Sequence, residues 1–209
     1  MEFWHSELVE RSWRILQELK KRYEFTLVGG WAVYLYTKAL KSKDIDLIVD
    51  YGTLERLGRE HPLKKNMRLR KYELLLDEVE VDIYVPFFSR LGIPVEEVTA
   101  RETVLEGFRV PGPEVLLILK QAAEVERAGS VKGLKDRIDI LALLIRADID
   151  WNSYKTLTKQ YSLDSYRDRL RDLVERADRE FDGLGITNPR QVKLIKKKIL
   201  TGLSTILYG

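Results

Sequence analysis

The chain has 209 residues, of which 44% are hydrophobic and 33% charged, and a formal net charge of +3, which is typical of a soluble globular protein with one large or two small domains. The absence of cysteine excludes disulfides, thiolate zinc sites and cysteine nucleophiles, and two histidines are too few for a histidine-built metal site. No apolar run approaches 18 residues and the first 20 residues lack the apolar core of a signal peptide, so we expect a cytoplasmic protein without membrane contact.

In the first half of the chain, segments with strand patterns alternate with segments whose apolar residues recur at helical spacing. We predict a helix over residues 6–22, a strand over 25–28, a helix over about 30–40, a strand over 44–49 and a short helix after Thr53. Gly29-Gly30 breaks the first strand and opens the helix that follows it.

Residues 67–76 and 79–85 predict a β-hairpin with Asp77-Glu78 at its turn. The second arm alternates strictly between apolar and polar residues, so Val81 and Asp82 point to opposite faces of the sheet. A single short strand is expected at 103–110.

From Pro113 onward the spacing of apolar residues is helical. We predict helices from Pro113, over 134–146, after Asp150, from about 164 to 182 and from 189 to about 207, with a loop at 129–133. The expected fold class is therefore α+β, with an N-terminal α/β core over residues 1–111 and a C-terminal helical domain over residues 112–209.

Asp44 and Asp46 lie on one face of the strand predicted over 44–49, with α-carbons roughly 6.5–7 Å apart. Two carboxylates this close raise each other's pKa unless a cation lies between them, and their hard oxygen atoms suit magnesium that carries a phosphate substrate. Asp82 adds a third carboxylate from a neighbouring strand, and such a shared set can hold two magnesium ions. The alternative is a strand end with solvated acids.

Gly29 and Gly30 allow the backbone to approach a ligand closely, and the amides of the helix that follows attract an anion. The residues from Trp31 onward would therefore present a helix N-terminus to a phosphate. The alternative is a tight strand-to-helix turn.

Basic residues are concentrated in residues 56–71 and 190–198. Patches of this size can follow a phosphate backbone, although neither segment is interleaved with the aromatic side chains on which bases stack. The alternative is a solvated face of a highly charged protein.

Val28-Gly29-Gly30, a spacer of thirteen residues, Asp44-Ile45-Asp46-Leu47 and the later Val81-Asp82-Ile83 resemble the signature of the nucleotidyltransferases of the DNA polymerase β superfamily. The resemblance implies a nucleotidyltransferase-like mixed β-sheet with flanking helices, and the transfer of a nucleoside monophosphate from an NTP with Mg²⁺ or Mn²⁺. It implies that Asp44 and Asp46 bind the metal, and that Asp82 is a third ligand or the general base. It also implies that the phosphates lie near four residues: Gly29, Gly30, Ser42 and Lys43.

Within that superfamily the chain is most similar to AbiEii-type proteins, which include toxins of toxin–antitoxin systems. Ser42-Lys43-Asp44 resembles their second motif, Lys120 their third and Asp136 their fourth, with Asp139 as the second candidate. The resemblance covers residues 27–145 and implies that Lys120 and Arg127 contact the nucleotide and that Lys120 and Asp136 are catalytic. It leaves open whether the acceptor is an RNA such as tRNA, a protein or a small molecule, and whether an antitoxin protein binds the chain.

The same residues allow structural interpretations. Lys120 can lie at the edge of an apolar helix face with its charged end in solvent, and Asp136 and Asp139 can form weak surface ion pairs. Two functions other than catalysis also stay open: a non-catalytic nucleotide- or nucleic-acid-binding module on the same scaffold, and a nucleic-acid-binding protein that acts through its basic segments.

Overall fold

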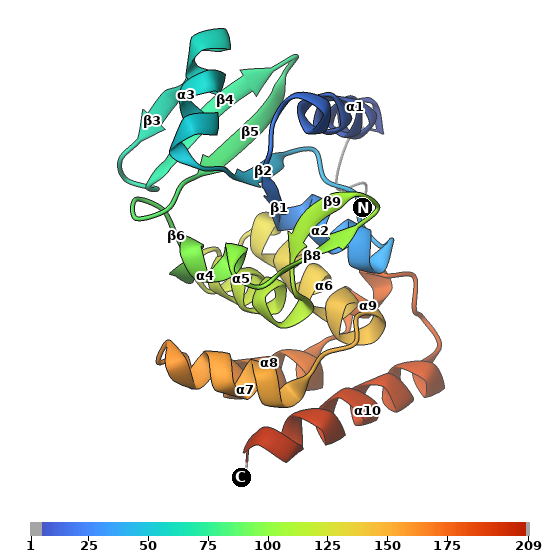
Figure 1. Cartoon of the computed structure of the whole chain (residues 1–209). Helices are drawn as coiled ribbons and strands as arrows, with labels where there is room; N and C mark the ends of the chain where they lie inside the picture. The colour runs from blue at the N-terminus through green and yellow to red at the C-terminus, as the bar shows by residue number, and fades with distance from the viewer. Residues whose placement is uncertain (1–5, 208–209) are drawn as a thin grey trace. The chain divides into compact units, whose positions relative to one another are not determined.

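The computed structural model of the protein describes residues 6–207. The chain divides into two compact units, Met1–Gly112 and Pro113–Gly209, which we name unit 1 and unit 2. Unit 1 combines a mixed β-sheet with helices, and the described part of unit 2 is helical (Figure 1). The predicted α+β class, with a mixed sheet, flanking helices and a C-terminal helical region, is therefore confirmed.

Within the described part of unit 1, seven strands form one sheet in the order β3-β4-β5-β2-β1-β9-β8. The strands are β1 (Thr26–Val28), β2 (Ile45–Ile48), β3 (Lys64–Asn66), β4 (Lys71–Leu76), β5 (Val79–Tyr84), β8 (Glu102–Leu105) and β9 (Phe108–Pro111). β2 runs antiparallel to β1 and parallel to β5, and β1 runs parallel to β9. A separate antiparallel pair is formed by β6 (Arg90–Leu91) and β7 (Ile93–Pro94).

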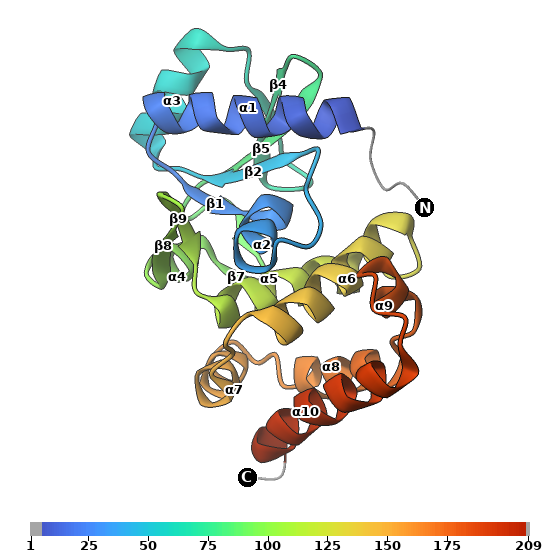
Figure 2. The same cartoon turned by 90° about the vertical axis from the view of Figure 1, so that its right-hand side faces the viewer.

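Helices cover the sheet of unit 1 on both faces. They are α1 (Ser6–Arg22), α2 (Gly29–Thr37) and α3 (Tyr51–Glu60), whereas the short α4 (Val95–Thr99) contacts β7. In Figure 2, α1 runs above the sheet beside α3, and α2 lies below it, packed on β1 and β2. Buried Leu27, Leu47 and Ile83 form part of the core between these layers, because each strand turns its apolar side chains toward a helix.

Three predictions for unit 1 need correction. The expected single strand at 103–110 is a hairpin, because Glu106 and Gly107 both adopt positive φ and form the two-residue turn between β8 and β9. The helix after β2 begins at Tyr51 rather than after Thr53, since the Asp50 carboxylate accepts a hydrogen bond from the Thr53 amide at 2.6 Å. The short elements β3, β6, β7 and α4 were missed. In contrast, the predicted hairpin with its turn at Asp77-Glu78 is confirmed, although its first arm begins at Lys71 rather than at residue 67.

Unit 2 consists, in its described part, of α5 (Pro113–Glu126), α6 (Val131–Arg146), α7 (Trp151–Gln160), α8 (Ser165–Arg176), α9 (Arg179–Gly183) and α10 (Pro189–Leu207). α5 packs along α6, and α10 packs on α7 and α8. The predicted loop at 129–133 ends at Ser130, whose hydroxyl caps α6. The predicted helix over 164–182 is two helices, because Ala177 adopts an extended backbone between α8 and α9. No helix within residues 6–207 is long and apolar enough to cross a membrane.

Candidate functional site

The residues predicted to carry chemistry fall into two groups. Unit 1 contains Gly29, Gly30, Ser42, Lys43, Asp44, Asp46 and Asp82, and unit 2 contains Lys120, Arg127, Asp136 and Asp139. Within each unit, the structure brings key members of the group together.

In unit 1, two of the three predicted acids face each other across neighbouring strands. β2 and β5 are parallel, and their register places Asp46 directly opposite Asp82. Both side chains are partly buried, and the opposite face of each strand is apolar and buried. Asp44 is also partly buried, but it lies in a bend one residue before β2 rather than in the strand.

The backbone of α2 begins against the Asp46 carboxylate. Gly29 adopts a φ of +66°, and a Cβ at this position would lie 2.0 Å from Asp46 Oδ2. The N-cap residue Val28 provides no side-chain hydrogen bond to the first turn of the helix. On the other side, the Tyr84 hydroxyl donates to Asp46 Oδ1 at 3.4 Å. Glycine is therefore required here by a close approach as well as by backbone conformation.

Asp82 has a lysine partner that the sequence interpretation missed. Lys71 Nζ lies 2.5 Å from Asp82 Oδ2 and 3.4 Å from a Glu73 carboxylate oxygen. The Lys71 ammonium group therefore lies between two acids. Asn66 Nδ2 donates a hydrogen bond to the same Glu73 carboxylate at 2.8 Å.

The Asp82 carboxyl has a strongly perturbed pKa. Burial and the neighbouring charge of Asp46 raise the pKa of Asp82 to about 6, and the contact with Lys71 opposes this shift. Burial also lowers the pKa of Lys71, but the hydrogen bond and charge of Asp82, together with Glu73, raise it above the usual value. A partly buried carboxyl with a raised pKa beside a second carboxyl is a feature typical of active sites.

The donor set of unit 1 fits one divalent cation better than two. Magnesium is commonly held by one or two carboxylates together with substrate phosphates, and Asp44 and Asp46 can supply such oxygen atoms. Asp82 already contacts an ammonium group through Oδ2. Among residues 6–207, no three histidine, aspartate or glutamate side chains are grouped so that they could hold one metal ion.

Lys71, Glu73 and Tyr84 were missed, although the sequence held a signal for two of them. The predicted turn at Asp77-Glu78 fixes the register of the hairpin, which pairs Glu73 with Asp82. Lys71 lies two residues earlier on the same face of β4, within reach of the same carboxylate.

In unit 2, the predicted residues form a buried network of charges between α5 and α6. Lys120 is 6% exposed, and its Nζ lies 2.7 Å from Asp139 Oδ2 and 3.4 Å from Asp136 Oδ1. Arg127 Nη2 lies 2.8 Å from Asp136 Oδ2, and Lys135 Nζ lies 3.4 Å from Asp139 Oδ2. The interpretations of Lys120 as a solvent-reaching lysine and of the two aspartates as surface acids are therefore wrong. Burial lowers the pKa of Lys135, against the charge of Asp139.

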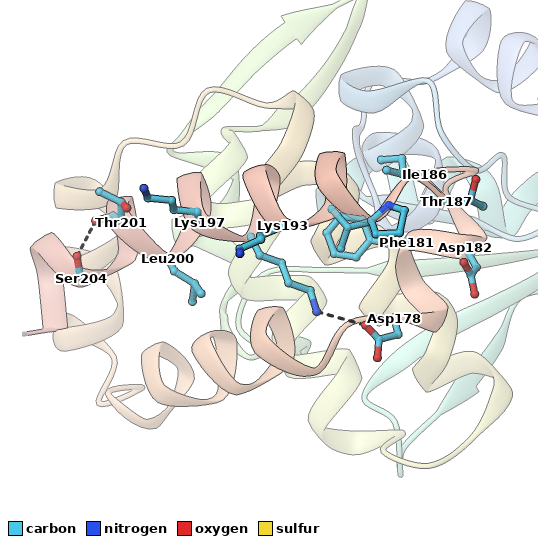
Figure 3. Close-up of a pocket in the computed structure, with 13 residues that line it drawn as sticks. Asp178, Phe181, Asp182, Ile186, Thr187, Lys193, Lys197, Leu200, Thr201 and Ser204 are labelled. Carbon is cyan, nitrogen blue, oxygen red and sulfur yellow. Dashed lines mark hydrogen bonds and ion pairs between the residues drawn. The ribbon is translucent and has the colours of Figure 1, made fainter.

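A groove in unit 2 lies along α9 and α10 and has a volume of about 820 Å³ (Figure 3). Phe181, Ile186 and Leu200 contribute apolar lining, and Lys193 and Lys197 come from the basic segment 190–198. The lining described includes none of the predicted catalytic residues.

Comparisons with known proteins find solved structures that are similar to this chain. No protein-family model matches the chain, and no curated protein matches its sequence. The crystal structure of JHP933 from Helicobacter pylori is 18% identical, with a TM-score of 0.50, over 96% of this chain and 97% of that one. A second H. pylori structure, described as a candidate nucleotidyltransferase, is 18% identical over 95% and 98% of the two chains, with a TM-score of 0.49.

A third solved structure is an antigenic nucleotidyltransferase-like protein from Paracoccidioides brasiliensis. It is 18% identical, with a TM-score of 0.43, over 80% of this chain and 91% of that one. The structural neighbours thus include nucleotidyltransferase-like proteins, and at these identities the likeness to JHP933 shows a shared fold.

Proposed function

We propose that the chain is a metal-dependent nucleotidyltransferase that transfers a nucleoside monophosphate from an NTP to an acceptor, with release of pyrophosphate. The observation that carries this proposal is the pairing of Asp46 with Asp82 across β2 and β5, where the backbone of Gly29 lies against one carboxylate. Such a group of partly buried acids costs stability, and a cation with a bound triphosphate would offset this cost.

In this proposal, Asp44 and Asp46 hold Mg²⁺ or Mn²⁺, and Gly29, Gly30, Ser42 and Lys43 lie around the phosphates. When bound, the metal supplies positive charge that neutralises the triphosphate and lowers the pKa of the attacking hydroxyl. Asp82 acts as the base that takes the proton of the acceptor rather than as a third ligand, since among residues 6–207 no three histidine or acidic side chains are grouped to hold one ion. Lys71 is a positioning residue, because its ammonium group fixes the Asp82 carboxylate through Oδ2.

The network in unit 2 gives Lys120, Arg127 and Asp136 a structural role in the packing of α5 against α6. Their contribution to nucleotide binding or catalysis stays a prediction. The same holds for a kinship with AbiEii-type proteins and for a place in a toxin–antitoxin pair.

The direct test is nucleotide transfer with each labelled NTP, Mg²⁺ and a panel of acceptors that includes tRNA, proteins and small molecules. Asp44→Asn is expected to lower the transfer rate at least about 100-fold, because it removes a carboxylate that carries the metal. Asp168→Asn, which changes an exposed acid on α8, is the matched control and should keep the rate. Wild-type transfer by the Asp44→Asn protein, or transfer unaffected by chelation, would contradict the proposal.

A non-catalytic nucleotide-binding module is the second candidate, since a folded sheet with these acids could bind an NTP without turnover. Calorimetric titration of a non-hydrolysable NTP analogue separates the two. Binding that needs Mg²⁺ together with labelled product supports the enzyme, whereas binding that does not change with Mg²⁺, without product, supports the module.

A further inference from the structure

Phe87 is an exposed aromatic residue in an unfavourable backbone conformation. Its side chain is 87% exposed, and its φ of +61° lies in the left-handed region that favours glycine. The Phe87 amide donates to a Glu96 carboxylate oxygen at 2.6 Å, which helps to hold this conformation. Because exposed apolar area and a strained backbone both cost stability, such an outlier points to a functional role.

Basic residues contact Phe88, the residue next to Phe87. Residues 61–72 contain five basic and no acidic residues, and the turn between β3 and β4 lies within them. Arg70 Nε donates to the Phe88 carbonyl at 2.6 Å, and Lys65 Nζ lies 4.6 Å from the centre of the Phe88 ring. The fold thus supplies the aromatic neighbours that the basic segment lacks in sequence.

Both parts of this surface lie close in sequence to residues of the acidic site. Arg70 directly precedes Lys71, whose ammonium group contacts Asp82. Phe87 follows Asp82 by five residues, so the two α-carbons are at most about 18 Å apart. A linear polymer that binds at Phe87 therefore needs only a few monomers to reach the acidic residues.

We propose that the surface formed by Lys65, Arg70 and Phe87, with Arg68 in the same turn as Arg70, binds single-stranded RNA, and we name it the Phe87 surface. A base stacks on the Phe87 ring, and the cations contact the neighbouring phosphates. A docked protein is less favoured, since the cores of protein interfaces are depleted of charged residues, whereas residues 61–72 carry five basic residues beside the exposed Met67 and Leu69. The inference rests on the proposed function in one respect only, because it assigns the bound RNA as the acceptor of the nucleoside monophosphate.

The test is fluorescence anisotropy with a labelled single-stranded RNA of about 12 nucleotides, and with the DNA of the same sequence, in EDTA and without NTP. Phe87→Leu keeps an apolar side chain but removes the stacking face, and we expect it to weaken RNA binding about 10-fold or more. Phe87→Tyr should restore binding. Val104→Ala, a change at an exposed apolar residue of β8, is the matched control and should bind as the wild type does.

The charges are tested separately by the salt dependence of binding. Arg68→Gln should weaken binding to all RNA sequences and reduce the slope of log K against log salt by about one. Equal binding by Phe87→Leu and wild type, tighter binding of the DNA, or a loss confined to Lys193→Gln and Lys197→Gln in α10 would overturn the inference. Asp44→Asn should bind RNA normally, so a failure of transfer and a failure of RNA binding are distinguished.

Discussion

At Gly29, a hydrogen atom in place of a side chain allows α2 to begin against the Asp46 carboxylate. We predict that Gly29→Ala lowers the free energy of unfolding by about 1–3 kcal/mol, because the residue keeps a positive φ and its Cβ must displace the carboxylate. Nucleotide transfer should fall at least about tenfold as Asp46 moves. Urea denaturation and the transfer assay measure the two effects.

Gly185→Ala is the matched control, since Gly185 has a similar φ of +71° but no atom within 4 Å of an added Cβ. The Gly185→Ala variant should lose only the free energy of unfolding that comes from the positive φ, and its rate of nucleotide transfer should not change. Equal losses of stability in the two variants would remove the steric argument for Gly29.

Asp82 makes the stability of the protein depend on pH. Its folded pKa of about 6 lies above the ordinary value of 3.8, so the folded protein binds the proton more tightly than the unfolded chain does. As the pH rises through this window, the wild type loses free energy of unfolding, and the loss persists at higher pH. We predict that Asp82→Asn, which cannot ionise, is about 1–3 kcal/mol more stable than the wild type at pH 8 in EDTA.

At pH 4 this difference should fall below about 1 kcal/mol, because Asp82 is then protonated in the folded state and partly protonated in the unfolded chain. Urea denaturation at the two pH values measures it, with Asp168→Asn as the exposed control. A stability difference of the same size at both pH values would show that the ionisation of Asp82 is not its source.

At the scale of elements, the packing of α5 against α6 depends on buried ion pairs. Asp139 lies between Lys120 and Lys135, and its side chain is 1% exposed. We predict that Asp139→Asn lowers the free energy of unfolding by about 3–5 kcal/mol, because two buried ammonium groups lose a shared partner. Thermal unfolding followed by circular dichroism measures the change. Asp168→Asn, in an exposed pair on α8, should cost less than about 1 kcal/mol; a comparable loss there would contradict the prediction.

The hairpin of β4 and β5 could be predicted because its alternation and turn are local in sequence, and they fix which residue faces Asp82. The β8–β9 hairpin was harder, since Glu106-Gly107 interrupts an otherwise continuous strand pattern. The burial of Lys120 and Asp139 could not be inferred from one helix, because it arises where the polar positions of α5 meet those of α6. Likewise, the nearness of Arg70 to Phe88 depends on two loops that lie 18 residues apart.

At the scale of the whole molecule, the sequence supported an α+β chain with strands in its first half, and the diglycine and aspartate motifs identified the part of the sheet that carries the acids. What it did not reveal is the strand order, because non-local pairing is set by the packing of helices on both faces and not by any local pattern. β1 has its sequence neighbour β2 on one side, but its other neighbour is β9.

The place of β9 beside β1 has a consequence for biosynthesis. Thr26 pairs with Arg109, so one side of an early strand stays without its partner until more than 80 further residues have left the ribosome. Contacts between such distant parts of a chain close slowly, and an unpaired strand edge can associate with other chains. Nascent chains that end before Phe108 should therefore aggregate and recruit chaperones. Chains that extend through Pro111 should do neither.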